Sequence, residues 1–389
     1  MTDETPPPAP VVLLVLPAME SGGVEPGMAE NTAAIVGAGG TALVASAGGR
    51  MVADVERAGG RAVTLPLNRK SPLEIWRNAA RLAALIRAER VNIVHAHSRA
   101  PGWSAWLAAR RTGVHFVTTY HAPYGERPRF KRLYNSVMAR GEVVVAVSRH
   151  LAGLVTARHG VDPGRIRVIP RGVDPAVFDP AAVAPARMAA LARAWGVPEG
   201  APILLLPGRL TRWKGQEEMI DALARMRHRD AVVVLVGADR GRSGYARGLS
   251  ALAARLGVAD RVRLAGLTDD MPAALALAAI VVNASNEPEG FGRVIIEAQA
   301  MARPVIATAH GGAAETVVHG KTGWLVPPGD AAALAMALDA VLDLPAARRA
   351  QVGAHARAAV QAHYTVAAMQ QAKLAVYRAL LATTPARRR

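Results

Sequence analysis

Residues 280–309, IVVNASNEPEGFGRVIIEAQAMARPVIATA, carry the pattern from which the fold can be worked out. The apolar runs IVVNAS (280–285) and PVIATA (304–309) have the length and composition of buried strands. A glycine-rich turn and a helical stretch separate them. This order is typical of a βαβ unit, whose two strands run parallel in one sheet.

The same alternation of strand and helix patterns continues toward the N-terminus. The clearest helix begins at Ser71, which is expected to cap the backbone, with Pro72 in the first turn and Glu74 closing a capping box. Other apolar runs of strand length are VVLLVL, TALVAS, AVTLPL, NIVHAH, HFVTTYH, VVVAVS and RIRVIP, followed later by ILLLPG, AVVVLVG and RVRLAG.

A chain of 389 residues exceeds what one hydrophobic core usually organises, so two domains are expected. The pattern restarts after RIRVIPRGVDPAVFDPAAV, and the proline-rich residues 174–185 are the best candidate for the connection. We expect an α/β protein with two doubly wound, Rossmann-like domains, over residues 1–180 and 181–365, facing each other across a cleft. Residues 366–389 are expected to form a helix that packs back on the first domain, followed by a basic tail. Ligands of such sheets bind at the carboxyl ends of the strands.

The amino-acid composition restricts the cellular compartments and the classes of partner that are expected for this protein. The chain has no cysteine, which excludes disulfides and cysteine metal sites and favours a reducing compartment, the cytosol. No apolar run approaches the roughly 18 residues of a membrane-spanning helix, so membrane contact is expected to be peripheral. The net charge of +17 is dispersed, whereas nucleic-acid binders concentrate positive charge in a stripe. We therefore expect no nucleic-acid partner.

The motif EGFGRVIIE (289–297) places two carboxylates around a glycine-rich turn that runs into a helix. Glu297 lies about one turn inside the helix, where a carboxylate can accept both hydroxyls of a ribose. Gly290 and Gly292 let the backbone approach a diphosphate, and the amides of residues 292–294 can bind its oxygens. The alternative is an ordinary helix start with two surface glutamates. The residues expected to bind a ligand at this turn are Glu289, Gly290, Phe291, Gly292, Arg293, Val294 and Glu297.

The second motif, PGRLTRWKG (207–215), stands at the carboxyl end of the run ILLLPG. Arg209 and Lys214 are both within reach of a pyrophosphate there. Fixed cations stabilise a leaving nucleoside diphosphate as its negative charge develops, without a metal ion. The alternative is a basic surface loop, since arginine is common in this chain.

Together, EPEGFGRVIIEAQAMARPVIAT, GRLTRWKGQ, VIPRGVD and GGAAETVVHGKTGWLVPPGD resemble glycosyltransferase family 4, in which Gly311, Gly312 and Glu315 match a Gly-Gly-x-x-Glu segment. The resemblance spans most of the chain and implies a GT-B fold, a metal-independent hexosyltransferase and retention of the anomeric configuration. It also implies an N-terminal acceptor-side domain and a C-terminal domain that binds the nucleotide sugar. The implied roles are ribose binding for Glu297, diphosphate binding for Arg209 and Lys214, and contact with donor-sugar hydroxyls for Glu289. The lipopolysaccharide-core enzymes of bacteria are one such type.

In the N-terminal half, the resemblance points to two strand ends. Gly22 and Gly23 follow the first strand, like the glycine loop that faces the donor phosphate in similar enzymes, although Pro26 departs from the residue often found there. His121, after HFVTTY, matches the histidine placed against the donor sugar, while His95 is expected to pack in the sheet. Weaker candidates for contact with the acceptor are His97, Ser98 and Arg99. Arg171 replaces a frequent asparagine in VIPRGVD and is given no catalytic role.

These residues favour a retaining glycosyltransferase over two other classes. Glu289 is either a nucleophile or a hydrogen-bonding group beside a leaving phosphate that acts as base, and we prefer the second. A nucleotide-sugar 2-epimerase of similar fold and a non-catalytic nucleotide-sugar-binding protein stay open as alternatives. The spacing in SGGVEPG does not fit a dinucleotide-binding dehydrogenase. The sequence does not fix the nucleoside, the sugar or the linkage.

Residues 127–140 combine an apolar pattern with basic residues. Phe130, Leu133, Tyr134, Val137 and Met138 fall at helical spacing, and basic residues stand at positions 127, 129, 131, 132 and 140. We expect one helix that touches an anionic bilayer at the inner face of the cytoplasmic membrane, consistent with a glycan or lipid-linked acceptor. The alternative is a helix docked on its own sheet with solvated charges.

Overall fold

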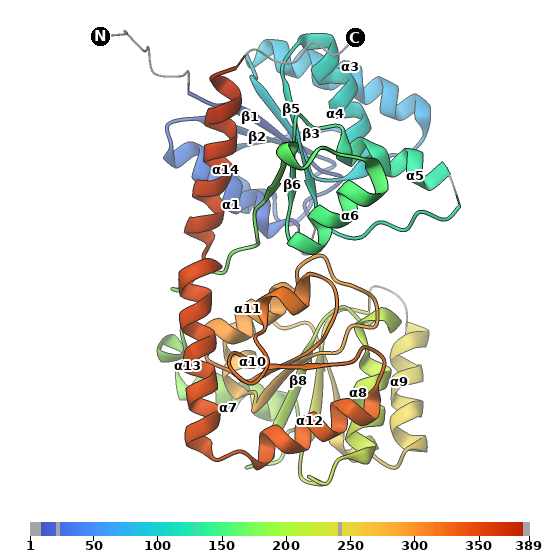
Figure 1. Cartoon of the computed structure of the whole chain (residues 1–389), viewed down its shortest axis with the longest axis vertical. Coiled ribbons are helices and arrows are strands. Elements are labelled where there is room, and N and C mark those ends of the chain that lie inside the picture. Colours follow the sequence, from blue (N-terminus) through green and yellow to red (C-terminus); the bar gives the residue numbers. More distant parts are fainter. Residues whose placement is uncertain (1–8, 21–23, 129, 240–242, 384–389) are drawn as a thin grey trace. The chain divides into compact units, whose positions relative to one another are not determined.

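The computed structural model describes residues 9–20, 24–128, 130–239 and 243–383 and divides the chain into two units. Unit 1 comprises Met1–Pro170 and Val366–Arg389, and unit 2 comprises Arg171–Thr365 (Figure 1). The chain therefore enters unit 2 at Arg171, a few residues before the proline-rich stretch 174–185. It returns to unit 1 at Val366.

Unit 1 contains a fully parallel sheet with the strand order β3-β2-β1-β4-β5-β6-β7. Each strand begins within or beside one of the apolar runs identified in the sequence. The strands are β1 (Val11–Val15), β2 (Thr41–Ser46), β3 (Arg61–Thr64), β4 (Ile93–Ala96), β5 (His115–Tyr120), β6 (Val143–Ala146) and β7 (Ile166–Val168).

Helices cover both faces of this sheet, as the alternation along β1 illustrates. Leu13 belongs to a core cluster with α3 (Pro72–Ala88) and α4 (Arg99–Thr112), whereas Leu14 belongs to a cluster that includes Tyr377 of α14 (Val366–Leu381). The C-terminal helix α14 lies alongside α1 (Figure 1). The helices are α1 (Pro26–Gly37), α2 (Val52–Arg57), α3 (Pro72–Ala88), α4 (Arg99–Thr112), α5 (Phe130–Asn135), α6 (Arg149–His159) and α14 (Val366–Leu381), with 3-10 turns η1 (Ser136–Ala139) and η2 (Pro163–Arg165).

Unit 2 contains a second parallel sheet, with the order β10-β9-β8-β11-β12-β13. Its strands are β8 (Ile203–Pro207), β9 (Val232–Val236), β10 (Val262–Gly266), β11 (Ile280–Asn283), β12 (Val305–Thr308) and β13 (Trp324–Val326). Its helices are α7 (Pro185–Ala194), α8 (Gln216–Arg225), α9 (Ser243–Arg255), α10 (Met271–Leu277), α11 (Arg293–Ala300), α12 (Ala331–Asp343) and α13 (Ala346–His363), with 3-10 turns η3 (Pro180–Ala182), η4 (Arg212–Lys214), η5 (Ala259–Arg261) and η6 (Gly312–Thr316).

The expected α/β class with two Rossmann-like sheets is confirmed, with two local differences. Ser71 caps α3 by accepting a hydrogen bond from the Glu74 amide at 3.3 Å, but the Glu74 carboxylate binds Arg77 at 2.9 Å instead of closing the box. The apolar runs identified in the sequence did not include β13, a strand of three residues.

Candidate functional site

Two loops of unit 2 leave neighbouring strands where the strand order reverses. β8 and β11 lie side by side, with β9 and β10 beyond one of them and β12 and β13 beyond the other. Doubly wound sheets bind ligands at the carboxyl ends of the strands at this point. The loop after β8 carries Arg209 and Lys214, and the loop after β11 carries Glu289. The fold thus brings the two sequence motifs to one edge of one sheet.

Close backbone packing holds the loop after β8 in place. A Cβ atom on Gly237, directly after β9, would lie 1.9 Å from the carbonyl oxygen of Gly208. Gly215 has φ +75°, and a Cβ atom there would lie 1.9 Å from the carbonyl oxygen of Ala284. The loop is therefore confined between the ends of β9 and β11, which fixes where its cations can reach.

The two cations of this loop have different surroundings. The Lys214 side chain is 13% exposed, and its Nζ lies 2.7 Å from Glu289 Oε1 and 4.4 Å from the centroid of the Trp213 ring. Arg209 is exposed, while its carbonyl oxygen accepts a hydrogen bond from the buried Gln216 at 2.9 Å. The fold thus fixes the position of the Lys214 ammonium but only the backbone of Arg209.

Glu289 is the centre of a buried polar cluster. Its Oε1 accepts hydrogen bonds from Lys214 Nζ at 2.7 Å, from Asn283 Nδ2 at 2.8 Å and from the Ser285 hydroxyl. Burial alone would raise the Glu289 pKa, but the Lys214 charge and these hydrogen bonds outweigh it and hold the pKa below its ordinary value. The carboxylate is therefore ionised at neutral pH and held in one orientation.

The glycine turn after Glu289 leads directly into α11. Gly290 and Phe291 are buried, and Gly292 has φ +84°, a left-handed conformation that favours glycine. The Gly292 carbonyl oxygen accepts a hydrogen bond from the Ile295 amide, so the helix starts at this residue. The amides of residues 292–294 consequently belong to a helix N-terminus, which favours negative charge.

Glu297 lies on the first turns of α11, and its carboxylate is paired. Arg293 Nε lies 2.8 Å from Glu297 Oε1, in a pair spaced four residues along the helix. The two side chains are 24% and 12% exposed, respectively. A ligand that approaches Glu297 therefore meets a carboxylate whose orientation Arg293 fixes. Val294, between them, is half-buried.

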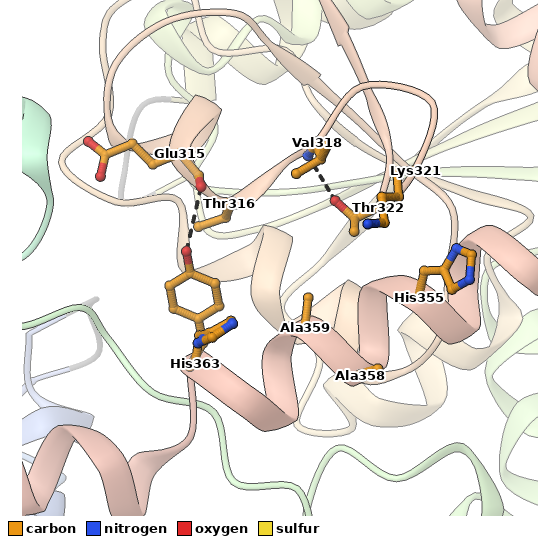
Figure 2. A pocket seen from close by; sticks show the side chains of 10 residues that line it. Glu315, Thr316, Val318, Lys321, Thr322, His355, Ala358, Ala359 and His363 are labelled. Carbon is orange, nitrogen blue, oxygen red and sulfur yellow. Dashed lines mark hydrogen bonds between the residues drawn. The ribbon is translucent and has the colours of Figure 1, made fainter.

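An aromatic side chain of the glycine turn, Phe291, packs against Tyr364. The rings of Phe291 and Tyr364 have centroids 5.8 Å apart, and the Tyr364 hydroxyl lies 3.5 Å from the Glu315 carbonyl oxygen. Tyr364 also lines a pocket of about 420 Å³ between α13 and the segment 315–322 (Figure 2). Figure 2 shows the Glu315 carboxylate pointing away from this pocket. Glu315 therefore contacts Tyr364 through its backbone carbonyl oxygen and not through its carboxylate.

In unit 1, His121 and His97 form a pair at the ends of β5 and β4. His97 Nδ1 lies 3.1 Å from His121 Nε2, and the two rings stack with centroids 5.3 Å apart. His97 is buried, whereas His121 is half-buried. His95 is fully buried in the sheet, as expected. His121 is thus the histidine of this group that reaches the surface of unit 1.

The residues expected near an acceptor make contacts within unit 1. Ser98 directly precedes α4. The Arg99 guanidinium carbon lies 4.4 Å from the centroid of the Tyr124 ring and 5.7 Å from that of Tyr134, and Nη1 donates to Asn135 Oδ1 at 3.1 Å. The Arg99 side chain is therefore anchored within unit 1 by two aromatic rings and by Asn135.

The glycine loop of unit 1 lies at the limit of the described residues. Gly22 and Gly23 fall outside them. The loop's last residues are described: the Val24 amide donates to Glu25 Oε2 at 3.0 Å, and Pro26 occupies the first position of α1, where proline is well tolerated.

Residues 127–140 do not form the single helix that their apolar spacing predicted. α5 ends at Asn135 and the 3-10 turn η1 follows, with Val137 and Met138 buried. Phe130 and Leu133, in contrast, are 69% and 65% exposed. Val137 and Met138 of η1 pack inward against α4, whereas Phe130 and Leu133 of α5 do not pack inward. Of the basic positions, Arg129 lies outside the described residues.

Sequence reasoning missed the side chains that hold Glu289. Asn283 and Ser285 stand two residues apart at the end of the run IVVNAS, so they share one face of the extended chain. His310 Nε2 lies 2.7 Å from the Ser285 carbonyl oxygen and supports the same loop from β12. Polar residues at the end of an apolar run were the available signal. Their shared partner could be identified only from the packing.

Within the described residues, no group of three or more His, Cys, Asp or Glu side chains is arranged to hold a metal ion. In the same part of the chain, no helix has the length and apolar character needed to cross a membrane.

Comparison with known proteins places both halves of the chain in glycosyltransferase families. Residues 188–359 match the family described as "Glycosyl transferases group 1", and residues 21–177 match "Glycosyltransferase Family 4". A relative from Salinispora arenicola, named "D-inositol 3-phosphate glycosyltransferase", is 36% identical over 289 residues, which are 67% of this chain. The matched stretch spans 64% of the length of that relative.

Solved structures share the fold over nearly the whole chain. A glycosyltransferase from Rickettsia africae is 35% identical with a TM-score of 0.88, covering 96% of this chain and 98% of that one. HepE of Anabaena, solved in complex with UDP and glucose, is 24% identical with a TM-score of 0.82, covering 95% and 99% of the two chains. The chain therefore belongs to the group 1 glycosyltransferases with a family 4 N-terminal half and has the GT-B fold of two Rossmann-like domains.

Proposed function

We propose that this protein is a retaining glycosyltransferase that moves a hexose from a nucleoside diphosphate sugar to a glycan or glycolipid. The observation that carries the proposal is the cluster of Lys214 and Glu289 beside the N-terminus of α11, at the switch point of the unit 2 sheet. Positive charge, a helix N-terminus and an oriented carboxylate suit a diphosphate with a sugar attached. UDP is the first nucleotide to test, since the Anabaena structure contains UDP.

Each charged group has a distinct task in the proposed reaction. Arg209 and Lys214 stabilise the diphosphate as the bond between the anomeric carbon and the phosphate oxygen breaks and the electron pair moves to that oxygen. Glu297, oriented by Arg293, accepts the ribose hydroxyls. The acceptor hydroxyl bonds to the anomeric carbon from the face that the phosphate leaves and gives its proton to the leaving phosphate.

Glu289 fits a hydrogen-bonding role better than a nucleophilic one. Three donors converge on its Oε1, and a carboxylate held in this way is stabilised as an anion and is a weaker nucleophile. We infer that Glu289 orients Lys214 and accepts hydrogen bonds from sugar hydroxyls. Replacement of Glu289 by Gln should slow turnover, and wild type incubated with donor should accumulate no sugar–enzyme adduct. Mass spectrometry of wild type with donor is the test, and a glycosylated Glu289 would contradict this role.

Positive charge from side chains makes a metal ion unnecessary in this scheme. Replacing Arg209 or Lys214 by Ala is expected to lower turnover by about 10²-fold or more, because both act on the breaking bond. Chelator should leave the rate unchanged. Arg212, exposed on the same loop, is a matched control for loss of one cation. If only the Michaelis constant for the donor rises, the cations act in binding and not on the transition state.

An assay with donor alone separates transfer from the related epimerase reaction. A transferase needs its acceptor, so UDP-glucose alone should turn over slowly and only by hydrolysis. An epimerase would convert large amounts of donor without an acceptor. Absence of both hydrolysis and transfer across all donors would favour a binding protein.

The acceptor is proposed to be a glycan or a lipid-linked glycan, such as a lipopolysaccharide core. The relatives named for D-inositol 3-phosphate supply the competing candidate. Transfer from the same donor to core oligosaccharide, to intact lipid-linked core and to D-inositol 3-phosphate should be compared directly. A strong preference for the inositol phosphate would replace the glycan proposal.

A lipid-linked acceptor would suit contact with an anionic membrane at its cytoplasmic face. Phe130 and Leu133 on α5 are exposed beside the exposed cations Arg127 and Lys131. Leu73 and Trp76, at the start of α3, are also more than half exposed. Hydrogen bonds from Ser104 to Ile75 and from Trp103 to Tyr134 join both helices to α4. Apolar and aromatic side chains with nearby cations are typical of interfacial binding.

Liposome co-sedimentation tests this contact. Binding to vesicles that contain phosphatidylglycerol should fall at high salt, and replacing Phe130 and Leu133 by Ser should weaken it. Replacing Leu267 by Ser is the matched control, because it removes an exposed leucine from unit 2. Equal sedimentation of all variants would favour a soluble acceptor.

A further inference from the structure

A line of three histidine rings runs from the core of unit 1 to the strand ends. The ring centroids of His95 and His97 are 4.2 Å apart, with the planes tilted by 33°. His97 stacks in turn on His121, with planes 17° apart and a nitrogen–nitrogen distance of 3.1 Å. The charge and position of the buried rings can therefore influence His121, the ring proposed to face the donor sugar.

Helix α14 closes the buried end of this line. The Tyr377 hydroxyl lies 2.7 Å from His95 Nδ1, and the Thr119 hydroxyl lies 2.7 Å from His95 Nε2. Both nitrogens of a fully buried ring thus have partners, and one partner is supplied more than 280 positions later in the chain. These bonds fix the orientation of His95, and through the stack they limit where His97 can lie.

Lys373 lies one helical turn before Tyr377 and is also buried. It is 5% exposed, and its Nζ donates to Asn31 Oδ1 of α1 at 2.6 Å. A buried ammonium disfavours a second positive charge nearby. Burial, and then the charge of Lys373, hold the pKa of His95 well below its ordinary value. His121, the histidine proposed to contact the sugar, therefore stands at the outer end of this line, and His95, at its inner end, is kept neutral.

We propose that α14 is part of the N-terminal half of the active site, where Tyr377 and Lys373 are positioning residues that hold the line His95, His97 and His121 in place and keep a cation near its buried end. A neutral imidazole can accept one hydrogen bond and donate another, whereas an imidazolium only donates. The catalytic part of this inference rests on the proposed contact between His121 and the donor sugar. Other charged or titratable groups on the surrounding elements are Glu30 of α1, Arg99 of α4, and Tyr124, which hydrogen-bonds to the His121 backbone.

Nuclear magnetic resonance of the ligand-free full chain with labelled histidine tests the structural part. Replacing Lys373 by Met removes the charge at similar length. We expect the titration midpoints of the ring signals from the line to rise by about 0.5 to 1 pH unit. Tyr377→Phe should shift the His95 ring nitrogens. Val376→Ala is the control, because it changes a buried residue of the same helix that carries neither a charge nor a side-chain hydrogen-bonding group.

The pH profile of UDP-glucose turnover tests the catalytic part. Because removal of the cation raises the pKa of the line, the rings gain protons at higher pH, and the acidic limb of kcat/KM should move up by the same amount. Lys373→Arg retains a cation and should leave the limb near its wild-type position. Val376→Ala should lower the melting temperature without moving the limb.

The outcomes separate this inference from the proposed function. Ring signals that are unchanged in both Lys373→Met and Tyr377→Phe overturn the inference, whatever the activity. Ring signals that move while the pH profile does not would overturn the role of His121 and leave the role of α14 in the histidine line standing. If Lys373→Met does not fold, Tyr377→Phe, which removes a single oxygen atom, decides the question through the His95 signals.

Discussion

At the scale of single residues, Glu297 gives the sharpest test of the donor site. The Glu297 carboxylate is 12% exposed and paired with Arg293, so its removal takes away both the proposed ribose contacts and the partner of a nearby cation. We expect Glu297→Ala to weaken UDP binding by roughly 2–4 kcal/mol. Isothermal titration measures this directly. Glu217→Ala, at a glutamate that is 43% exposed, is the control, and equal affinities would reduce Glu297 to a structural residue of α11.

Glu289 predicts a dependence of stability on pH. Its folded pKa lies below the ordinary value of 4.5, so the ionised form stabilises the fold, and this contribution is lost as pH falls through the lowered pKa. Urea unfolding should show that Glu289→Gln is less stable than wild type by about 1–3 kcal/mol above pH 5. The difference should shrink toward pH 3. A difference that is constant with pH would mean that Glu289 is not ionised in the fold.

The cluster around Glu289 also shows what could not be predicted from the sequence. EGFGRVIIE and GRLTRWKG could be identified because each is a local pattern of charge and glycine. The bonds from Lys214, Asn283 and Ser285 to one oxygen atom arise only when the ends of β8 and β11 meet. That meeting depends on strand order, and no periodic pattern in the chain encodes it.

At the scale of secondary-structure elements, glycine sets the path of the loop that carries Arg209 and Lys214. Gly237→Ala would place a Cβ atom 1.9 Å from the Gly208 carbonyl oxygen and force the loops after β8 and β9 apart. We expect a loss of stability of about 1–3 kcal/mol and weaker UDP binding. Gly248→Ala in α9, where the added atom meets nothing within 4 Å, is the matched control and should be stabilising. Equal melting temperatures would show that the loops have room to separate.

The elements themselves were largely predictable, and the exceptions have physical reasons. The strands appear as apolar runs and α3 appears through Ser71 and Pro72, because burial and capping are local signals. The segment 127–140 does not form the predicted single helix, because helical spacing does not show which apolar residues find a partner. Val137 and Met138 pack inward, whereas Phe130 and Leu133 do not.

At the scale of the whole molecule, helix α14, which lies near the C-terminal end of the chain, contributes residues to the hydrophobic core of unit 1. Met369, Val376 and Tyr377 share a cluster with β1 and β2, although the chain completes unit 2 between them. The unit 1 core therefore depends on residues from both ends of the chain. Truncation before Val366 removes one wall of that core as well as the Tyr377 hydroxyl, which is why the histidine line must be tested in the full chain.

The proposed donor site predicts which segments of the chain a free nucleotide contacts. In unit 2, the residues proposed to bind the nucleoside diphosphate lie in two segments, 208–216 and 289–297. UDP at one hundred times its dissociation constant should add about 2.7 kcal/mol of stability to the form that binds it. Among UDP, GDP and ADP, the cognate nucleotide should give the largest rise in melting temperature.

Hydrogen exchange then locates that binding. With the cognate nucleotide, amide protection should increase at 208–216 and 289–297, because the proposed contacts use the β8 loop and the α11 N-terminus. The α9 helix around Gly248 is the internal reference for unit 2, and α3 is the reference for unit 1, because neither helix is proposed to contact the donor. In the Glu297→Ala variant, the nucleotide should add less amide protection than it adds to wild type at the same nucleotide concentration, because a smaller fraction of the variant has nucleotide bound. Protection confined to unit 1 would move the nucleotide site away from the β8 and β11 strand ends and overturn the assignment of Lys214 and Glu297 to the donor.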